Sequence, residues 1–257
     1  LDDQDSGTKY GLGSSGAVTV ATVEAILLYY GYELDPLLVF KLSVLTQARL
    51  NMTGSHGDLA ASSFRGLVAY YSLDKSWLSE QMYVQGLSNL LASDWKDLQI
   101  KQIGLPAPLE LLVGWTGSAA STTHLVSHME SKKTQQSKEE IYSQFLNESK
   151  VCVEQLIWAC QNKDIPCIKQ AVTRNRYLLR KFSEDMSLTI ETPLLTELCD
   201  SAEANGAVAK SSGAGGGDCG ICLVDSQEQK EAIQIIWEQA GIFPLPLTIA
   251  ERNKERI

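Results

Sequence analysis

Two glycine-rich segments contain the residues of this sequence that are best suited to bind phosphate. The first runs from Lys9 to Ala17 and reads KYGLGSSGA. Its glycines let backbone N–H groups approach phosphate oxygens, and the apolar stretch that follows predicts a helix whose N-terminus attracts anions. Ser14 and Ser15 can donate hydrogen bonds to phosphate or ligate a magnesium ion.

This first segment differs from two well-known phosphate loops. No Lys-Ser or Lys-Thr pair follows the glycines, so it is not a Walker A loop, and it lacks the GxGxxG spacing of dinucleotide-binding folds. The alternative that needs no ligand is a glycine turn whose serines cap the helix.

The second segment, from Lys210 to Gly220, reads KSSGAGGGDCG and has five glycines in eight positions. Apolar, strand-like stretches flank it, which a flexible linker would not require. We therefore interpret it as a backbone nest in which Lys210 and the neighbouring serines bind substrate phosphate. A tight turn with close backbone packing is the alternative.

Two other patterns suggest metal binding but lack the rest of a metal site. Cys219 and Cys222 form a CxxC pair with no second pair elsewhere, so we expect them to be core cysteines. His124 and His128 are four residues apart on an expected helix, but no glutamate follows His124 and the sequence offers no third ligand. We therefore expect no zinc site.

The composition is that of an ordinary globular protein. Of its 257 residues, 44% are hydrophobic and 21% are charged, with a formal net charge of -9. Such an acidic surface argues against nucleic acid or anionic membranes as partners. Scattered cysteines, together with the lack of a signal peptide or a membrane-length apolar run, predict a cytoplasmic protein.

The elements that would position these segments can be predicted from periodicity and caps. Residues 17–30 contain one charged residue, Glu24, and such a long apolar stretch predicts a buried helix. Asp35 and Pro36 predict the N-cap and the first turn of a second helix, which we expect to end near Leu50. Further helices are expected over residues 139–161, 165–186, 193–205 and 228–240. Strands are expected over residues 67–71, 98–103, 109–115, 206–211, 220–224 and 243–249. Helices mixed with antiparallel-type strands give an α+β fold class.

The two glycine segments together resemble those of the GHMP kinase superfamily. Its members have a GLGSS-type phosphate loop at the start of a buried helix, here Gly11 to Ser15, and a later K-x-S-G-A-G-G-G-D motif, here Lys210 to Asp218. Within the superfamily, residues 9–16 are most similar to the loop of phosphomevalonate kinases; mevalonate kinase-like loops usually have alanine at the position of Gly16. The resemblance covers nearly the whole chain.

The resemblance implies a two-lobed α+β fold. Residues 1–115 would be the remainder of the N-terminal, ATP-binding lobe and residues 116–257 the C-terminal lobe. In the family, strands before the phosphate loop supply a lysine and much of the adenine pocket, and this sequence lacks them. We therefore expect the chain to be truncated at its N-terminal lobe and not catalytically competent by itself.

The resemblance also implies an activity. It is transfer of a phosphoryl group from ATP to 5-phosphomevalonate, giving 5-diphosphomevalonate in the mevalonate pathway of isoprenoid biosynthesis, with Mg²⁺ as a cofactor. The backbone of Gly11, Leu12, Gly13, Ser14, Ser15 and Gly16 would hold the ATP phosphates, and Ser15 would ligate the magnesium ion.

Other roles follow from the same resemblance. Gly57-Asp58-Leu59-Ala60 matches a G-D-x-A sequence whose aspartate faces the transferred phosphate, so Asp58 is the candidate for the residue that orients or deprotonates the acceptor; a helix N-cap is the alternative. Lys9 would offset charge near the acceptor. The remaining candidates for substrate binding are Ser55, His56, Gly57, Arg65, Lys210, Ser212, Gly213 and Ala214.

Several alternatives stay open. Arg65 is either a bidentate clamp for substrate phosphate or a surface arginine. Thr116, Ser118 and Ser121 either bind substrate or cap the next helix. The protein could act as mevalonate kinase, diphosphomevalonate decarboxylase or homoserine kinase instead, or be a non-catalytic nucleotide or metabolite sensor on the same fold. The expected partner is a small-molecule substrate, and a homodimer is possible.

Overall fold

The structure is a computed structural model that describes residues 10–52, 54–117, 135–213 and 215–250. The chain divides into two compact units. The sheet unit comprises residues 1–12 and 105–248, and the helical unit comprises residues 13–104 and 249–257. The predicted α+β class is confirmed. The predicted lobe boundary after residue 115 stays a prediction, and the two compact units divide the chain at other points.

The sheet unit is built on a four-stranded antiparallel sheet with the strand order β4-β5-β3-β6. The strands are β3 (Glu110–Trp115), β4 (Val208–Ser211), β5 (Cys219–Val224) and β6 (Phe243–Leu245). The central pair, β3 and β5, aligns Leu112 with Cys222 and Gly114 with Gly220. The final strand was predicted over residues 243–249, but β6 covers only Phe243–Leu245.

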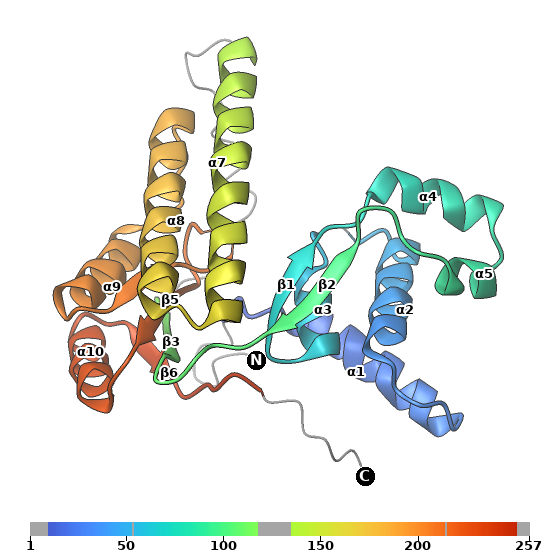
Figure 1. Cartoon of the computed structure of the whole chain (residues 1–257), viewed down its shortest axis with the longest axis horizontal. Coiled ribbons are helices and arrows are strands. Elements are labelled where there is room, and N and C mark those ends of the chain that lie inside the picture. The colour runs from blue at the N-terminus through green and yellow to red at the C-terminus, as the bar shows by residue number, and fades with distance from the viewer. Residues whose placement is uncertain (1–9, 53, 118–134, 214, 251–257) are drawn as a thin grey trace. The chain divides into compact units, whose positions relative to one another are not determined.

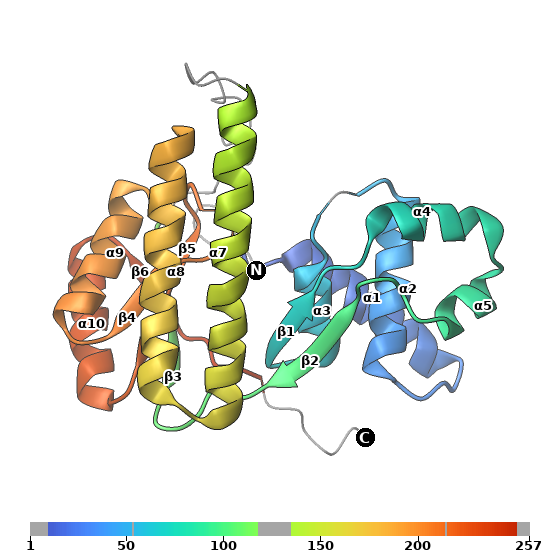
Figure 2. The ribbon, with the colours of Figure 1, turned by 45° about the horizontal axis from the view of Figure 1, so that its top comes forward.

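The described helices of this unit are α7 (Gln135–Asn162), α8 (Ile165–Met186), α9 (Pro193–Ala204) and α10 (Gln227–Gln239). Figures 1 and 2 show α7 and α8 lying side by side as a long hairpin. Helices α8 and α9 begin at the predicted residues, and α10 begins one residue before the predicted start at residue 228. The side chains of Asp164, Thr192 and Ser226 accept hydrogen bonds from backbone N–H groups of the first turns.

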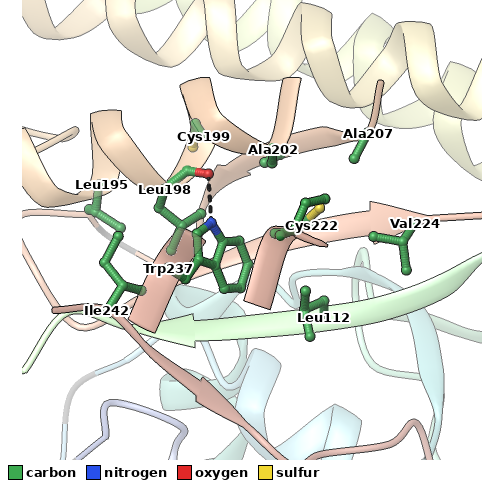
Figure 3. Packing of buried hydrophobic residues seen from close by; sticks show 12 residues of the cluster. Leu112, Leu195, Leu198, Cys199, Ala202, Ala207, Cys222, Val224, Trp237 and Ile242 are labelled. Carbon is green, nitrogen blue, oxygen red and sulfur yellow. Dashed lines mark hydrogen bonds between the residues drawn. The ribbon is translucent and has the colours of Figure 1, made fainter. Parts of the chain in front are cut away.

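The main core of the sheet unit lies between one face of the sheet and helices α9 and α10. Trp237 is fully buried there, and its indole N–H donates to the carbonyl of Leu198 at 3.1 Å (Figure 3). Side chains alternate along β3, so Leu112 joins this core, whereas Val113 and Trp115 pack in a second cluster. Tyr10 and Leu12 belong to that second cluster, so these two residues pack against the sheet.

The described residues of the helical unit form five helices and a two-stranded antiparallel sheet. The helices are α1 (Ser14–Tyr29), α2 (Pro36–Arg49), α3 (Gly57–Phe64), α4 (Lys75–Val84) and α5 (Leu87–Ala92), and the strands are β1 (Leu67–Tyr71) and β2 (Gln99–Ile103). Their core is centred on Phe40, Val44 and Leu59, which have no exposed surface.

Helix α1 differs from the prediction of a buried helix. Only Gly16 and Val20 are buried, whereas Val18 is 67% exposed and Tyr29 84% exposed. The apolar residues surround the helix, but within the unit only one side packs against α2 and α3. Composition therefore predicted the helix but not how much of its circumference would be covered.

Helix α2 begins as predicted, because the Asp35 carboxylate accepts a hydrogen bond from Leu38 N–H at 2.9 Å and Pro36 occupies the first turn. Helices α4 and α5 were not predicted. Among the residues that the structure describes, no helix is both long enough and apolar enough to cross a membrane.

Candidate active site

In the helical unit, the second half of the first glycine segment forms the N-terminus of α1. Gly13 is the N-cap residue and has a positive φ of 69°, a conformation that favours glycine. No side-chain hydrogen bond caps this end, and the first turn contains no acidic residue. The 16-residue helix thus presents its first N–H groups and its positive dipole end to an anion, beside the exposed Ser15.

The carboxylate of Asp58 lies against this helix terminus. A Cβ atom added to Gly16 would lie 2.2 Å from Oδ2 of Asp58, and one added to Gly13 would lie 3.0 Å from Cβ of Asp58. Asp58 is the second residue of α3, and the N-cap position is taken by His56 with a φ of 63°. The alternative that Asp58 is a helix N-cap is therefore wrong.

The segment just before Asp58 is held in place by three side chains of the same unit. The Tyr70 hydroxyl donates to the carbonyl of Ser55 at 2.8 Å, and the Lys75 ammonium donates to the carbonyl of Gly54. His56 is buried, and its Nδ1 lies 3.3 Å from Oε1 of Gln47. Burial, followed by the nearby Lys75 charge, lowers the pKa of His56, which favours its neutral form.

In the sheet unit, the first glycine of the segment lies against the end of the second glycine segment. Gly11 has a φ of 71°, and a Cβ atom there would lie 2.3 Å from Cγ of Asp218. The thiol of Cys219 donates to the carbonyl of Tyr10 at 3.2 Å, and the rings of Tyr10 and Trp115 meet edge to face at 4.9 Å. The unit therefore brings Gly11 and the second glycine segment together.

The second glycine segment forms a turn that only glycine can supply at several positions. Gly213, Gly215 and Gly216 have φ values of 67°, 77° and 80°. A Cβ atom on Gly215 would lie 2.4 Å from the carbonyl oxygen of Ile190, which accepts a hydrogen bond from Gly216 N–H at 2.8 Å. Both interpretations of this segment, a nest and a close-packed turn, fit this geometry.

Lys210 and Ser212 lie at the start of this turn. Lys210 is the third residue of β4, and its ammonium donates to the carbonyl of Ser211 at 2.7 Å. Burial lowers the pKa of this ammonium group, because an apolar surrounding disfavours its charged form. Ser212 N–H donates to the carbonyl of Cys219 at 2.9 Å and closes the turn.

Arg65 follows the last residue of α3 and pairs with Glu24 at 3.6 Å. Its role as a phosphate clamp stays a prediction. Several candidate residues lie outside the described part of the chain: Lys9, Ser118, Ser121, His124, His128 and Ala214.

No sequence pattern indicated the position of Asp218, the last residue of the K-x-S-G-A-G-G-G-D motif. Its contact with Gly11 joins positions 207 residues apart, 218 minus 11, and no local pattern signals such a pairing. Thr116 lies here too, since its N–H and hydroxyl both donate to the Asp218 carbonyl, at 2.9 and 3.0 Å.

The cysteines behave as core residues. Cys219 and Cys222 are free and buried, and burial raises the pKa of each thiol to about 12. Within the described ranges, no group of three or more His, Cys, Asp or Glu side chains is placed to hold a metal ion.

Comparison with known families gives two matches. Residues 4–66 match the GHMP kinases N terminal domain, and residues 156–242 match the GHMP kinases C terminal family. The first match contains the glycine segment at α1 together with Asp58, and the second contains the glycine segment between β4 and β5.

Three individual proteins are similar over almost the whole chain. The phosphomevalonate kinase of Streptomyces sp. strain CL190 is 40% identical over 248 residues, which are 96% of this chain and 66% of the Streptomyces protein. A structure of Streptococcus pneumoniae phosphomevalonate kinase in complex with phosphomevalonate and AMPPNP is 34% identical, with a TM-score of 0.80, and covers 95% of this chain. A Listeria innocua protein is 37% identical, with a TM-score of 0.90, and covers 98%. This chain spans 70% of each solved protein.

Proposed function

The chain belongs to the GHMP kinase family, and we propose that it acts as a phosphomevalonate kinase that transfers a phosphoryl group from ATP to phosphomevalonate. The observation that carries this proposal is the contact of the Asp58 carboxylate with Gly16 at the uncapped N-terminus of α1. An anion-binding helix terminus and a carboxylate that can orient the acceptor thereby occur within one compact unit.

The backbone from Gly11 to Gly16 is proposed to bind the ATP phosphates. Positive φ values at Gly11 and Gly13 turn the chain into the α1 terminus, whose N–H groups and dipole offset phosphate charge. Because phosphoryl transfer depends mainly on positioning and on charge stabilisation, such a terminus supplies much of what the reaction needs.

The residues around the α1 terminus fit a magnesium ion. Mg²⁺ is commonly held by one or two protein oxygens together with substrate phosphates, and the hydroxyl of Ser15 and the carboxylate of Asp58 are oxygen donors near this helix end. We assign Ser15 as the ligand. When bound, the ion would neutralise charge that develops on the transferred phosphoryl group.

Asp58 is proposed to position the acceptor rather than act as a strong base. In phosphomevalonate the attacking atom is a phosphate oxygen, which is already largely ionised near neutral pH because its second pKa is about 6. This oxygen forms a bond to the γ-phosphorus of ATP, while the bond from that phosphorus to the bridging oxygen breaks and ADP leaves. The products are 5-diphosphomevalonate and ADP.

The other substrate residues are proposed on the basis of their motifs. Lys9, Lys210 and Ser212 would offset negative charge near the acceptor, with Gly213 and Ala214 supplying backbone. Cytoplasmic location, assembly as a homodimer and the lack of nucleic-acid partners stay predictions from composition and resemblance.

The test is Asp58→Asn in the full-length protein, measured by a coupled ADP-release assay with phosphomevalonate. Loss of the carboxylate charge should lower turnover by about 10²- to 10⁴-fold, while ATP affinity stays within about twofold. Asp97→Asn, the same change at an exposed residue of the helical unit, is the control and should leave turnover unchanged.

Three outcomes would contradict the proposal. Unchanged turnover in Asp58→Asn would remove this residue from the mechanism. Turnover of mevalonate but not of phosphomevalonate by the unaltered protein would make it a mevalonate kinase, and ATP binding without turnover of either acceptor would make it a sensor.

A further inference from the structure

The loop that joins α8 to α9, residues 187–192, contacts the second glycine segment within the sheet unit. Ile190 of this loop is buried, and its carbonyl oxygen accepts a hydrogen bond from Gly216 N–H at 2.8 Å. A Cβ atom added to Gly215 would lie 2.4 Å from the same oxygen. The position of the glycine turn therefore depends on where the α8–α9 loop holds the Ile190 carbonyl.

A hydroxyl group on α8 fixes this part of the loop. The Oγ atom of Ser183 accepts a hydrogen bond from Ile190 N–H at 3.2 Å and donates one to the carbonyl oxygen of Leu188 at 2.6 Å. The backbone carbonyl of Ser183 accepts another from Leu188 N–H at 2.8 Å. Ser183 is itself buried, so its hydroxyl pairs backbone groups that would be costly to leave without a partner.

A buried ion pair holds the next residue of the loop. The Arg176 guanidinium donates to both carboxylate oxygens of Glu191, at 3.1 and 2.6 Å, and both side chains are buried. Such a bidentate contact fixes the orientation of the carboxylate as well as its distance. Ile190 is therefore anchored through its N–H group by Ser183 and through the following residue by Arg176.

The glycine turn needs this external support because glycine loses more conformational freedom on ordering than any other residue. Five of the eight residues from Gly213 to Gly220 are glycines. A backbone nest binds an anion best when its N–H groups are already fixed before the ligand arrives. Ser183 is not among the residues proposed to contact a substrate, so it can affect the reaction only through the position of this turn.

We propose that Ser183 is a positioning residue for the second glycine segment, and that it acts through the backbone of Ile190. The inference rests on the proposed function, because it takes the turn to bind substrate phosphate. It extends the functional part of the sheet unit from the turn to α8, with the ion pair of Arg176 and Glu191 as a second anchor of the same loop.

The test is Ser183→Ala in the full-length protein, assayed by ADP release at a temperature where the variant is fully folded. Loss of the hydroxyl should let the turn shift and lower kcat/KM for phosphomevalonate about 10- to 100-fold, because small displacements of binding groups are costly. The KM for ATP should change less than about twofold, since the ATP phosphates are assigned to the first glycine segment. A residue that only stabilised the fold would leave both constants unchanged under these conditions.

Ser201→Ala is the matched control in the same unit. It removes a serine hydroxyl from α9 whose hydrogen bonds, to the carbonyls of Glu197 and Leu198, stay within that helix. Its kinetic constants should equal those of the unaltered protein. Ser183→Thr keeps the hydroxyl and should retain most of kcat/KM. Both alanine variants should fold, because alanine favours helices, and thermal melting checks this.

Hydrogen exchange followed by mass spectrometry tests the same contact without a substrate. Peptides that contain Ile190 or Gly216 should exchange about 10-fold faster in Ser183→Ala, because the loop has lost the bonds that hold it against the turn. In Ser201→Ala the same peptides should exchange as in the unaltered protein.

The possible outcomes separate the two proposals. Unchanged kcat/KM for phosphomevalonate in Ser183→Ala would overturn the positioning role and leave the proposed function standing, and so would an equal loss in Ser201→Ala. An unaltered protein that turns over no phosphomevalonate would overturn the proposed function instead. Hydrogen exchange would then still decide the structural part: faster exchange at Gly216 in Ser183→Ala would support it, and unchanged exchange would overturn it.

Discussion

Asp58 and Gly16 depend on each other. The carboxylate can lie at the α1 terminus only because residue 16 has no side chain, since a Cβ atom there would be 2.2 Å from Oδ2 and 2.7 Å from Cγ of Asp58. From the sequence motif alone, Gly16 was expected to bind the ATP phosphates with its backbone N–H group. The structure adds a second reason for glycine, which is the space it leaves for the aspartate.

We therefore expect Gly16→Ala to lower turnover by about 10²-fold, because a displacement of roughly 1 Å at a catalytic group can cost that much. Stability should change by less than about 1 kcal/mol, since alanine favours the helix. Steady-state kinetics and thermal melting measure the two effects. Gly86→Ala is the control, because a Cβ atom added to this glycine of the same unit would meet nothing within 4 Å.

A double variant shows whether Gly16 acts through Asp58. If it does, Gly16→Ala in an Asp58→Asn background should cost little further activity, because the positioned group has already been removed. If the double variant instead loses turnover by the product of the two single-variant factors, Gly16 contributes independently of Asp58, for instance through its N–H group at the phosphate loop.

Helix starts were well predicted where a cap and an apolar period coincide. Asp35 with Pro36, and Pro193 after the Thr192 cap, begin helices at the expected residues. Helix α4 also has a cap, since Asp74 accepts from Trp77 N–H at 3.0 Å, but its 10 residues contain only one buried side chain, Leu78. Without a buried stripe, the sequence offered no periodic signal for this helix.

Helices α8 and α9 are joined by a charge cluster centred on the buried side chain of Arg176. Its guanidinium contacts Glu191 at 2.6 Å, Asp200 at 2.6 Å and Glu203 at 2.9 Å, and the Arg176 and Glu191 side chains are only 6% and 7% exposed. Burial opposes the charge, but the hydrogen bonds to the three acids raise the pKa of Arg176 above its ordinary value.

Arg176→Met should lower the free energy of unfolding by about 3–5 kcal/mol, because it leaves Glu191 buried without its partner. Arg174→Met, two residues earlier on α8, removes an exposed pair with Glu148 and should cost less than about 1 kcal/mol. Urea unfolding at neutral pH measures both. Equal losses in the two variants would mean that the cluster adds nothing beyond an ordinary surface pair.

The division of the chain into two units depends on contacts between residues that are far apart in the sequence, and no local sequence pattern indicates such contacts. Tyr10 and Leu12 belong with the sheet because they pack with Trp115 and Cys219, whereas Ile249 and Ala250 lie beside Gly66 of the helical unit. Each such join depends on contacts between residues more than 100 positions apart. Periodicity and caps report only on neighbours within a turn or a strand, so they predicted the elements better than their grouping.

Each unit has its own hydrophobic core, with no residue shared between the two clusters. Phe40 is fully buried in the helical unit and Trp237 is fully buried in the sheet unit. Phe40→Ala and Trp237→Ala should each cost about 3–5 kcal/mol, because each leaves a cavity in a packed core. The loss should be confined to the unit that carries the change.

Hydrogen exchange measured by mass spectrometry can locate that loss peptide by peptide, since protection reports the local opening free energy. In Phe40→Ala, peptides from residues 13–104 should exchange faster while those of β3 and β5 keep their protection; in Trp237→Ala the pattern should reverse. If either substitution released protection in both units together, the protein would unfold as one cooperative body, and two separate cores would not describe its energetics.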